Sequence, residues 1–216
     1  MTLFNRKPAA ALMAVSLFAA AMVGVAAGDA PQAAADAVPP GYSTTVTGTT
    51  HDFDYFMGSG WVTTQHRLKA TGVGSHDWET FPATLCGSPY LNGMATVDEM
   101  YAPTKRNSGL TLRTFDPAKR QWSIYWVSSK AGVLETPAMV GGFHGKVGEF
   151  YSEDHDTHGR PVKVRFLWTL RDQDHAHWEQ AYSYDNRTWE TNWTADFVRG
   201  DRAELCEDGR PKQIGA

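Results

Sequence analysis

The sequence predicts an all-β fold, a sandwich or a barrel of about ten antiparallel strands. Short segments rich in β-branched and aromatic residues recur along the chain between residues 61 and 198. Turn-forming clusters of Gly, Pro, Asn and Asp separate these segments, for example at Asp116-Pro117 and Asp185-Asn186. A third observation is that no long segment with helical periodicity interrupts the series.

Each expected strand is a short segment bounded by turn signals. One helical turn is expected before the first strand, at residues 51–58, where Asp52 can cap the turn and Gly58 can end it. The expected strands are residues 61–70, 76–84, 93–101, 109–115, 121–128, 138–143, 147–153, 161–169, 176–184 and 189–198.

The composition is typical of a globular domain and excludes several classes of protein. The chain has 216 residues, of which 12% are aromatic, and a net charge of −4. This aromatic content is too high for a disordered chain. The acidic balance argues against a nucleic-acid partner, because phosphate binding requires a basic surface. Two cysteines are too few for a disulfide-dense scaffold and fit no four-ligand zinc pattern.

The N-terminus has the pattern of a signal peptide, residues 1–27. Arg6 and Lys7 precede an apolar run that closes on small residues, with a cleavage site expected after Ala27. A membrane anchor is the alternative, but Ser16 interrupts the run and no basic stop-transfer residues follow it. The protein is therefore expected to be periplasmic or secreted, with no stable membrane span after removal of this segment.

Three further regions follow the signal peptide. Residues 28–50 are rich in Ala and Pro without apolar periodicity, which predicts a flexible linker. The strand pattern assigns residues 51–199 to the barrel and leaves residues 200–216 as a C-terminal tail. The sequence leaves the oligomeric state open.

The two cysteines lie far apart in the chain, Cys86 early in the domain and Cys206 after the last expected strand. Outside the cytoplasm a disulfide can form and persist. A bridge would pin the C-terminal tail to the barrel wall and would stabilise the fold by roughly 4 kcal/mol in the chain-entropy model. Two unpaired thiols are the alternative, since sequence does not give the separation of the two Cα atoms.

The alternation of side chains indicates which residues share a face of each strand. Within 121–128, Trp122, Ile124 and Trp126 share one face. Within 161–169, the face that contains Trp168 is apolar, whereas the opposite face carries charged residues. Neither face of the strands is purely polar, which is typical of a barrel wide enough to hold a ligand.

Three segments carry a family resemblance. The first runs from His51 to Trp61 and ends in a Gly-x-Gly-Trp entry to the first strand. The others are residues 110–126, which contain Trp122 and Trp126, and residues 178–193, which contain Trp178, Trp189 and Trp193. Together they resemble an uncharacterised bacterial family of lipocalin-like, or calycin, barrels with ten strands. The resemblance covers about residues 51–199 and implies a barrel whose closed end is plugged by Trp61.

The resemblance implies a fold but no reaction. The first strand departs from the family pattern, because Val62-Thr63-Thr64-Gln65 stands where more basic and His-rich residues are expected. Any role that the family gives to this strand is therefore not carried over. Functional expectations rest on the residues themselves.

Charged residues among apolar neighbours suggest a ligand site in the barrel, since buried charges must be paired or functional. We expect Arg113 and Arg165 to anchor an acidic or polar end of a small apolar or aromatic molecule. Trp126 and Trp168 are expected to pack on the body of that molecule, and Asn192 is a further contact. The alternative is an internal Arg–Glu ion pair or exposure on the outer face.

An enzyme in the same barrel is a second interpretation: a lyase, isomerase or hydrolase acting on a small apolar substrate. Glu179 or His66 would then move a proton while an arginine stabilised the developing negative charge. A third interpretation is a structural envelope protein whose barrel is filled and has no cavity.

No cofactor and no metal site are predicted. His155 and His158 lie in a stretch that joins two expected strands, which indicates a solvated hairpin loop rather than a metal site. His175 and His177 lie two residues apart at a strand start and lack the further ligands that a metal requires.

Overall fold

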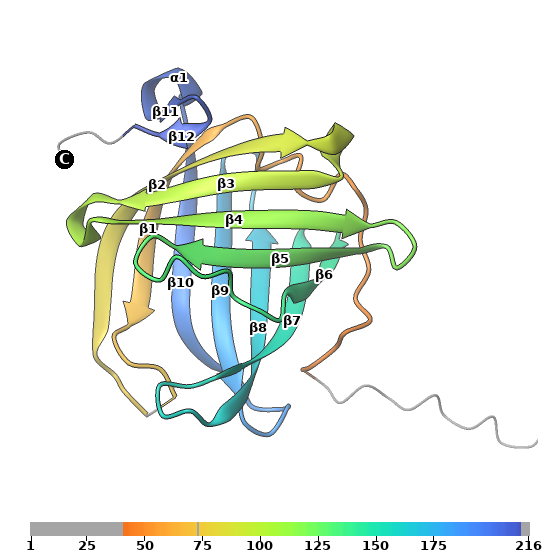
Figure 1. Ribbon diagram of the computed structural model, residues 1–216, viewed down its shortest axis with the longest axis vertical. Coiled ribbons are helices and arrows are strands. Elements are labelled where there is room, and N and C mark those ends of the chain that lie inside the picture. The colour runs from red at the N-terminus through yellow and green to blue at the C-terminus, as the bar shows by residue number, and fades with distance from the viewer. Residues whose placement is uncertain (1–40, 73, 213–216) are drawn as a thin grey trace, which may run out of the picture. The chain divides into compact units, whose positions relative to one another are not determined.

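A computed structural model describes residues 41–72 and 74–212. Ten strands of this region form a closed antiparallel barrel (Figure 1), which confirms the predicted fold class. Each strand pairs with its neighbours in the sequence, and β1 closes the barrel against β10. The predicted signal peptide and residues 28–40 of the predicted linker lie outside the described residues.

The ten strands follow the order that the turn signals predict, with small differences at their ends. The largest difference is in the second strand, which continues from the predicted end at Thr84 to Tyr90. The strands are β1 Gly60–Leu68, β2 Trp78–Tyr90, β3 Ala95–Ala102, β4 Asn107–Asp116, β5 Gln121–Ser128, β6 Met139–His144, β7 Val147–His155, β8 Pro161–Leu170, β9 His175–Ser183 and β10 Glu190–Gly200.

Short elements complete the described chain. Two 3-10 turns, η1 Leu91–Gly93 and η2 Pro103–Lys105, connect β2 to β3 and β3 to β4. A four-residue helix, α1 Arg202–Leu205, follows β10. Strands β11 Cys206–Glu207 and β12 Arg210–Pro211 then pair as a small separate sheet. Within the described region, no helix has the length and apolarity needed to cross a bilayer.

Aromatic side chains close the end of the barrel at which β1 begins. Trp61 is completely buried, and its indole Nε1 donates to the carbonyl of Phe56 at 3.0 Å. The ring of Phe56 stacks on that of Trp61 with centroids 5.2 Å apart. Phe53 packs edge-on against Trp122, with ring centroids 5.0 Å apart. The segment before β1 therefore plugs this end, which we call the closed end.

The plug segment contains the expected helical turn, although Asp52 has a different role from the predicted cap. The amide of Met57 donates to the carbonyl of Phe53 at 3.2 Å, and Gly58 ends the turn with a φ of 74°. The Asp52 carboxylate accepts from the amide of Thr49, which precedes it, and from the amide of Phe143 in β6. Asp52 thus ties the plug to the barrel wall.

The described end of the predicted linker lies against the barrel. Residues 41–50 run along its outside (Figure 1), and the Gln121 side chain donates to two of their backbone carbonyls, at 2.7 and 2.9 Å. Gly48 lies very close to Gly142 of β6. A Cβ atom at Gly142 would fall 2.5 Å from the amide nitrogen of Gly48. Because residues 41–50 make these contacts, the ordered domain begins earlier than residue 51. The Ala- and Pro-rich composition does not predict these contacts.

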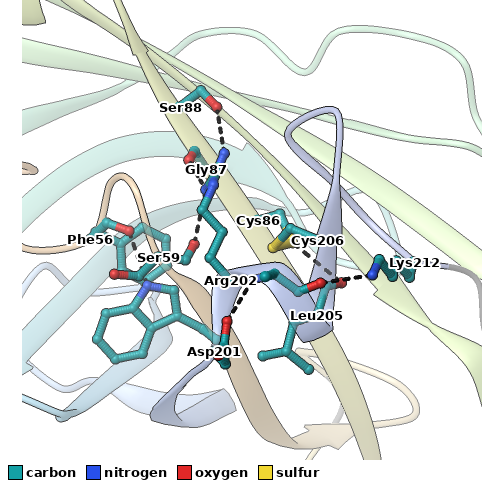
Figure 2. Close-up of a disulfide and its surroundings, with 12 residues drawn as sticks. Phe56, Ser59, Cys86, Gly87, Ser88, Asp201, Arg202, Leu205, Cys206 and Lys212 are labelled. Atoms are coloured by element: carbon teal, nitrogen blue, oxygen red, sulfur yellow. Dashed lines mark hydrogen bonds between the residues drawn. A yellow bond between two sulfur atoms is a disulfide. The ribbon is translucent and has the colours of Figure 1, made fainter.

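The C-terminal tail is also fixed to the barrel. Cys86 of β2 and Cys206 form a disulfide with Cα atoms 6.0 Å apart, which confirms the expected bridge (Figure 2). Arg202 donates to the carbonyls of Ser59 and Gly87. Residues 201–212, which follow β10, therefore cover the outside of the closed end.

Candidate functional site

The barrel encloses a cavity of about 690 Å³. It extends from the closed end to the loops β1–β2, β5–β6 and β7–β8, which contribute Thr71, Pro137 and Thr157 to its lining. These loops lie at the end opposite the plug, which we call the open end. The volume lies within the range of about 300–1,000 Å³ that is usual for small-molecule sites.

One side of the cavity is a continuous aromatic surface. The ring of Trp178 on β9 contacts that of Phe166 edge-on, with centroids 4.9 Å apart, and that of Trp193 at 5.6 Å. It also meets the ring of Trp168 at 6.5 Å. We define the aromatic wall as Phe166, Trp168, Trp178 and Trp193 of β8, β9 and β10, whereas Trp126 of β5 lines the cavity from a different part of the barrel.

A β-bulge in β10 brings two consecutive residues to the cavity. Thr191 pairs with Ala181 and Trp193 with Gln180, which leaves Asn192 unpaired between them. Asn192 and Trp193 both line the cavity, although neighbours in a regular strand point to opposite faces. The predicted contact Asn192 is thus placed at the cavity by an irregularity that alternation does not reveal.

Hydrogen bonds fix the side chains around this bulge. Gln180 Nε2 donates to Asn192 Oδ1 at 2.9 Å. The indole Nε1 of Trp193 donates to Gln65 Oε1 at 2.8 Å, and Gln65 Nε2 donates to Thr63 Oγ1 at 2.8 Å. These hydrogen bonds fix the side chains of Gln65, Gln180 and Asn192 beside the aromatic wall.

Arg113 lines the cavity but forms a buried ion pair with Asp98. Its guanidinium lies over the ring of Phe53 at 4.7 Å, and only 4% of its side chain is exposed. The Asp98 side chain is completely buried. Because the two charges neutralise each other, Arg113 is not a free cation that waits for the carboxylate of a ligand.

Arg165 does not reach the cavity. It follows Val164 in β8 and therefore points outward, where its guanidinium lies over the ring of Trp189 at 4.7 Å. Trp189 in turn contacts Tyr151, which packs against Tyr42 of the N-terminal segment. Arg165 was expected to anchor a ligand, but in this geometry it packs on an aromatic cluster outside the barrel and does not line the cavity.

The two candidate acid–base residues also point away from the cavity. Glu179 lies between the inward-facing Trp178 and Gln180, and one of its carboxylate oxygens is 3.4 Å from Nε2 of His177. The ring of His66 stacks on that of Trp78 with centroids 4.4 Å apart, and its Nδ1 lies 2.9 Å from the hydroxyl of Thr80. A proton transfer inside the barrel therefore cannot use either residue in this arrangement.

Titratable groups gather toward the open end. Burial raises the pKa of the Tyr182 hydroxyl to about 12, and the nearby carboxylate of Asp154 acts in the same direction. Burial, with a smaller effect of Asp154, also raises the pKa of Glu135. Arg67 lies over the ring of Trp193 at 4.8 Å and pairs with Glu79 at 2.8 Å. This end thus carries both signs of charge.

The two histidine-rich stretches lie in a hairpin turn and beside carboxylates. His155 ends β7 and His158 lies in the turn to β8, which confirms the predicted hairpin loop. Nδ1 of His175 lies 2.8 Å from Asp172, and Nδ1 of His177 lies 2.8 Å from Asp196. Across residues 41–72 and 74–212, no group of three or more metal-type side chains converges.

Several cavity residues were absent from the predicted site, namely Gln65, Phe166, Trp178, Gln180 and Trp193. The alternation of β8 and β9 could have found most of them, because they share faces with Trp168 and Tyr182. Trp193 follows the bulge and carried no such signal.

No protein-family model matches the chain, and a search of curated proteins finds no match either. Function is therefore inferred from the geometry of the cavity and the chemistry of its lining.

Proposed function

We propose that the barrel binds a small, mainly apolar or aromatic molecule in its cavity. The observation that carries this proposal is a 690 Å³ cavity faced on one side by the aromatic wall. Protein interiors are otherwise packed as densely as organic crystals, and an empty volume of this size is costly to keep. A predominantly apolar lining with a few placed polar groups is typical of small-molecule sites.

The environment of the protein belongs to the same proposal. We infer that the barrel works outside the cytoplasm, in the periplasm or after secretion. The Cys86–Cys206 disulfide supports this inference, because disulfides persist mainly in oxidising compartments. The signal-peptide pattern of residues 1–27 is the second support.

The other two interpretations receive less support. The enzyme interpretation named Glu179 and His66, and both point away from the cavity. A barrel filled for a purely structural role is opposed by the cavity itself. Binding of a molecule within the barrel is therefore the function that the geometry favours.

The test uses N-phenyl-1-naphthylamine, a neutral aromatic probe whose fluorescence rises in an apolar site. Thr111 of β4 is buried and lines the cavity opposite Trp126 in the adjacent strand, whereas Thr114 of the same strand is exposed. We expect the probe to bind the wild-type protein, and Thr111→Phe to weaken binding about tenfold or more by occupying its volume.

Thr114→Phe is the matched control, because it adds the same ring to the outer face of the same strand. It should bind the probe like the wild type, while circular dichroism verifies that both variants are folded. Equal binding by the wild type and Thr111→Phe, or no binding by the wild type, would sink the proposal.

A further inference from the structure

The hydrogen-bonded wall of the barrel is interrupted between β5 and β7. β5 pairs with β4 over its whole length, from Gln121 to Ser128, but with β6 only over residues 122–124. β7 pairs with β8 as far as His155, but with β6 only as far as Tyr151. In the described part of the chain, the last four residues of β5 and of β7 therefore have no β-ladder between them, which leaves a break beside the open end.

The connection from β5 to β6, residues 129–138, turns back alongside β5 and fills this break (Figure 1). The amide of Glu135 donates to the carbonyl of Trp126 on β5 at 2.8 Å. On the other side, the Ser152 hydroxyl of β7 donates to the carbonyl of Pro137 at 3.2 Å. Glu135 and Pro137 both line the cavity. This segment, which we call the flap, therefore closes the wall directly over the cavity.

The flap is held by few contacts. Residues 129–137 are all exposed, and even Val133 and Leu134 have exposed fractions of 67% and 43%. Moving the flap therefore transfers little additional apolar surface into water. Within the described chain, residues 133–137 are joined to the wall by two hydrogen bonds, those to β5 and β7. Segments with few buried apolar contacts are the first to open, at a low cost in free energy.

Three other loops of the open end are tied to one another. The buried Asp156 carboxylate accepts from Arg160 and from the Tyr184 hydroxyl, which joins the β7–β8 loop to the β9–β10 loop. The Thr157 hydroxyl donates to the carbonyl of Thr71 in the β1–β2 loop at 2.8 Å. Hydrogen bonds to an ionised group are about twice as strong as neutral ones. We call these three loops the latched loops, and no flap residue takes part in the bonds that join them.

We propose that the flap is the gate of the cavity, and that a ligand enters and leaves between β5 and β7 while the latched loops stay in place. This route breaks the two hydrogen bonds of the flap and spares those of the buried carboxylate. It also leaves undisturbed the aromatic wall on β8, β9 and β10, against which the ligand binds. This inference rests on the proposed function.

Two glycines allow the flap and a latched loop to be loosened in the same way. Gly132 in the flap has a φ of 63°, and Gly159 in the β7–β8 loop has a φ of 75°. Apart from its chain neighbours, a Cβ atom at either position would have no described atom within 4 Å, and neither glycine lines the cavity. Alanine therefore strains each backbone through its positive φ without touching the ligand or another element.

The experiment follows N-phenyl-1-naphthylamine by stopped-flow fluorescence. We expect Gly132→Ala to raise both the association and the dissociation rate constants about fivefold, because the strain destabilises the closed flap. The Kd should change by less than about twofold, because the strain is the same in the free and the occupied barrel.

Gly159→Ala is the matched control, because it places the same strain in a latched loop. Both rate constants should stay within about twofold of those of the wild type. Circular dichroism verifies that both variants are folded.

Hydrogen exchange of the wild-type protein is a second measurement, which needs neither a ligand nor a variant. The amide of Glu135 should be protected about tenfold less, or lower still, than the amide of Arg160, which donates to the Asp156 carboxylate at 3.0 Å. Equal protection of the two amides would mean that the flap opens no more readily than the latched loops, which contradicts the proposed gate.

Two kinetic results would overturn the inference while leaving the proposed function standing. They are unchanged rate constants in a folded Gly132→Ala variant and a larger acceleration by Gly159→Ala, which would place the route between the latched loops. Failure of the probe to bind the wild type would instead remove the proposed function, and this inference with it.

Discussion

The two ends of the barrel are held together by different chemistry. Phe53, Phe56 and Trp61 plug the closed end, and the disulfide fastens the C-terminal segment over it. At the open end, polar contacts around Asp156 connect three loops. Permanent apolar and covalent contacts therefore form the floor of the cavity, whereas three loops at the open end are connected through the buried carboxylate of Asp156.

The Asp156 side chain is completely buried at the open end. It accepts hydrogen bonds from Arg160 Nε at 2.7 Å and from the Tyr184 hydroxyl at 2.8 Å. Arg160 also donates to the carbonyl of Gly72 in the β1–β2 loop. Burial alone would raise the pKa of Asp156, but the hydrogen bonds from Arg160, Tyr184 and His158 outweigh it and hold the pKa below its usual range.

The largest expected effect concerns the closed end. Replacing both cysteines, Cys86→Ser with Cys206→Ser, should lower the free energy of unfolding by about 4–5 kcal/mol, because the bridge closes a loop with a sequence separation of 120. Urea unfolding measures the change. Reductant should destabilise the wild type similarly and leave the variant unaffected; a loss below about 1 kcal/mol would show that apolar packing alone holds this end.

The next effect concerns the ion pair above the plug. Arg113→Met leaves Asp98 buried without its partner and should cost about 3–4 kcal/mol in unfolding free energy. Adding Asp98→Leu removes the orphaned charge, so the double variant should recover much of the loss. If the double variant were as unstable as the sum of the two single variants, the pair would not be coupled as we describe.

The smallest effect concerns the open end and depends on pH. Because the pKa of Asp156 is lowered in the folded state, its contribution is complete above the ordinary carboxyl pKa of about 4 and is lost as the pH falls. Asp156→Asn should therefore lower the melting temperature at pH 7 and make it less sensitive to acid between about pH 5 and pH 2.

Asp154→Asn is the comparison for this prediction, since Asp154 lies on the same hairpin but is exposed. It should change the acid dependence of the melting temperature far less than Asp156→Asn does, because its side chain does not connect the three loops. An Asp156→Asn variant with the wild-type acid dependence would mean that the contacts of Asp156 do not stabilise the open end.

Most of the fold follows from the sequence, because turn residues and alternating apolar residues mark each strand separately. The inward position of Trp122, Ile124 and Trp126 was predictable from alternation in the same way. Long-range partners were not predictable by this means. The binding of residues 41–50 depends on the close approach at Gly142, which leaves no periodic signal in the segment itself.

The candidate site was predictable only in part, for a related reason. Alternation shows that Arg165 and Glu179 lie on the faces opposite Trp168 and Trp178, but charge among apolar neighbours made both resemble interior residues. The apolar neighbours of Arg165 belong to an outer cluster around Trp189 and Tyr151. The bulge at Asn192 changes the alternation of β10 and is visible only in the pairing of the strands.

The most direct measurement uses the eight tryptophans as reporters of position. Indole ¹H–¹⁵N NMR signals would be followed while N-phenyl-1-naphthylamine is added. Binding in the cavity should shift the signals of the four tryptophans that line it and leave the four that do not line it unshifted; shifts confined to the second group, or no shifts, would contradict binding in the cavity. The first group is Trp126, Trp168, Trp178 and Trp193, and the second is Trp61, Trp78, Trp122 and Trp189.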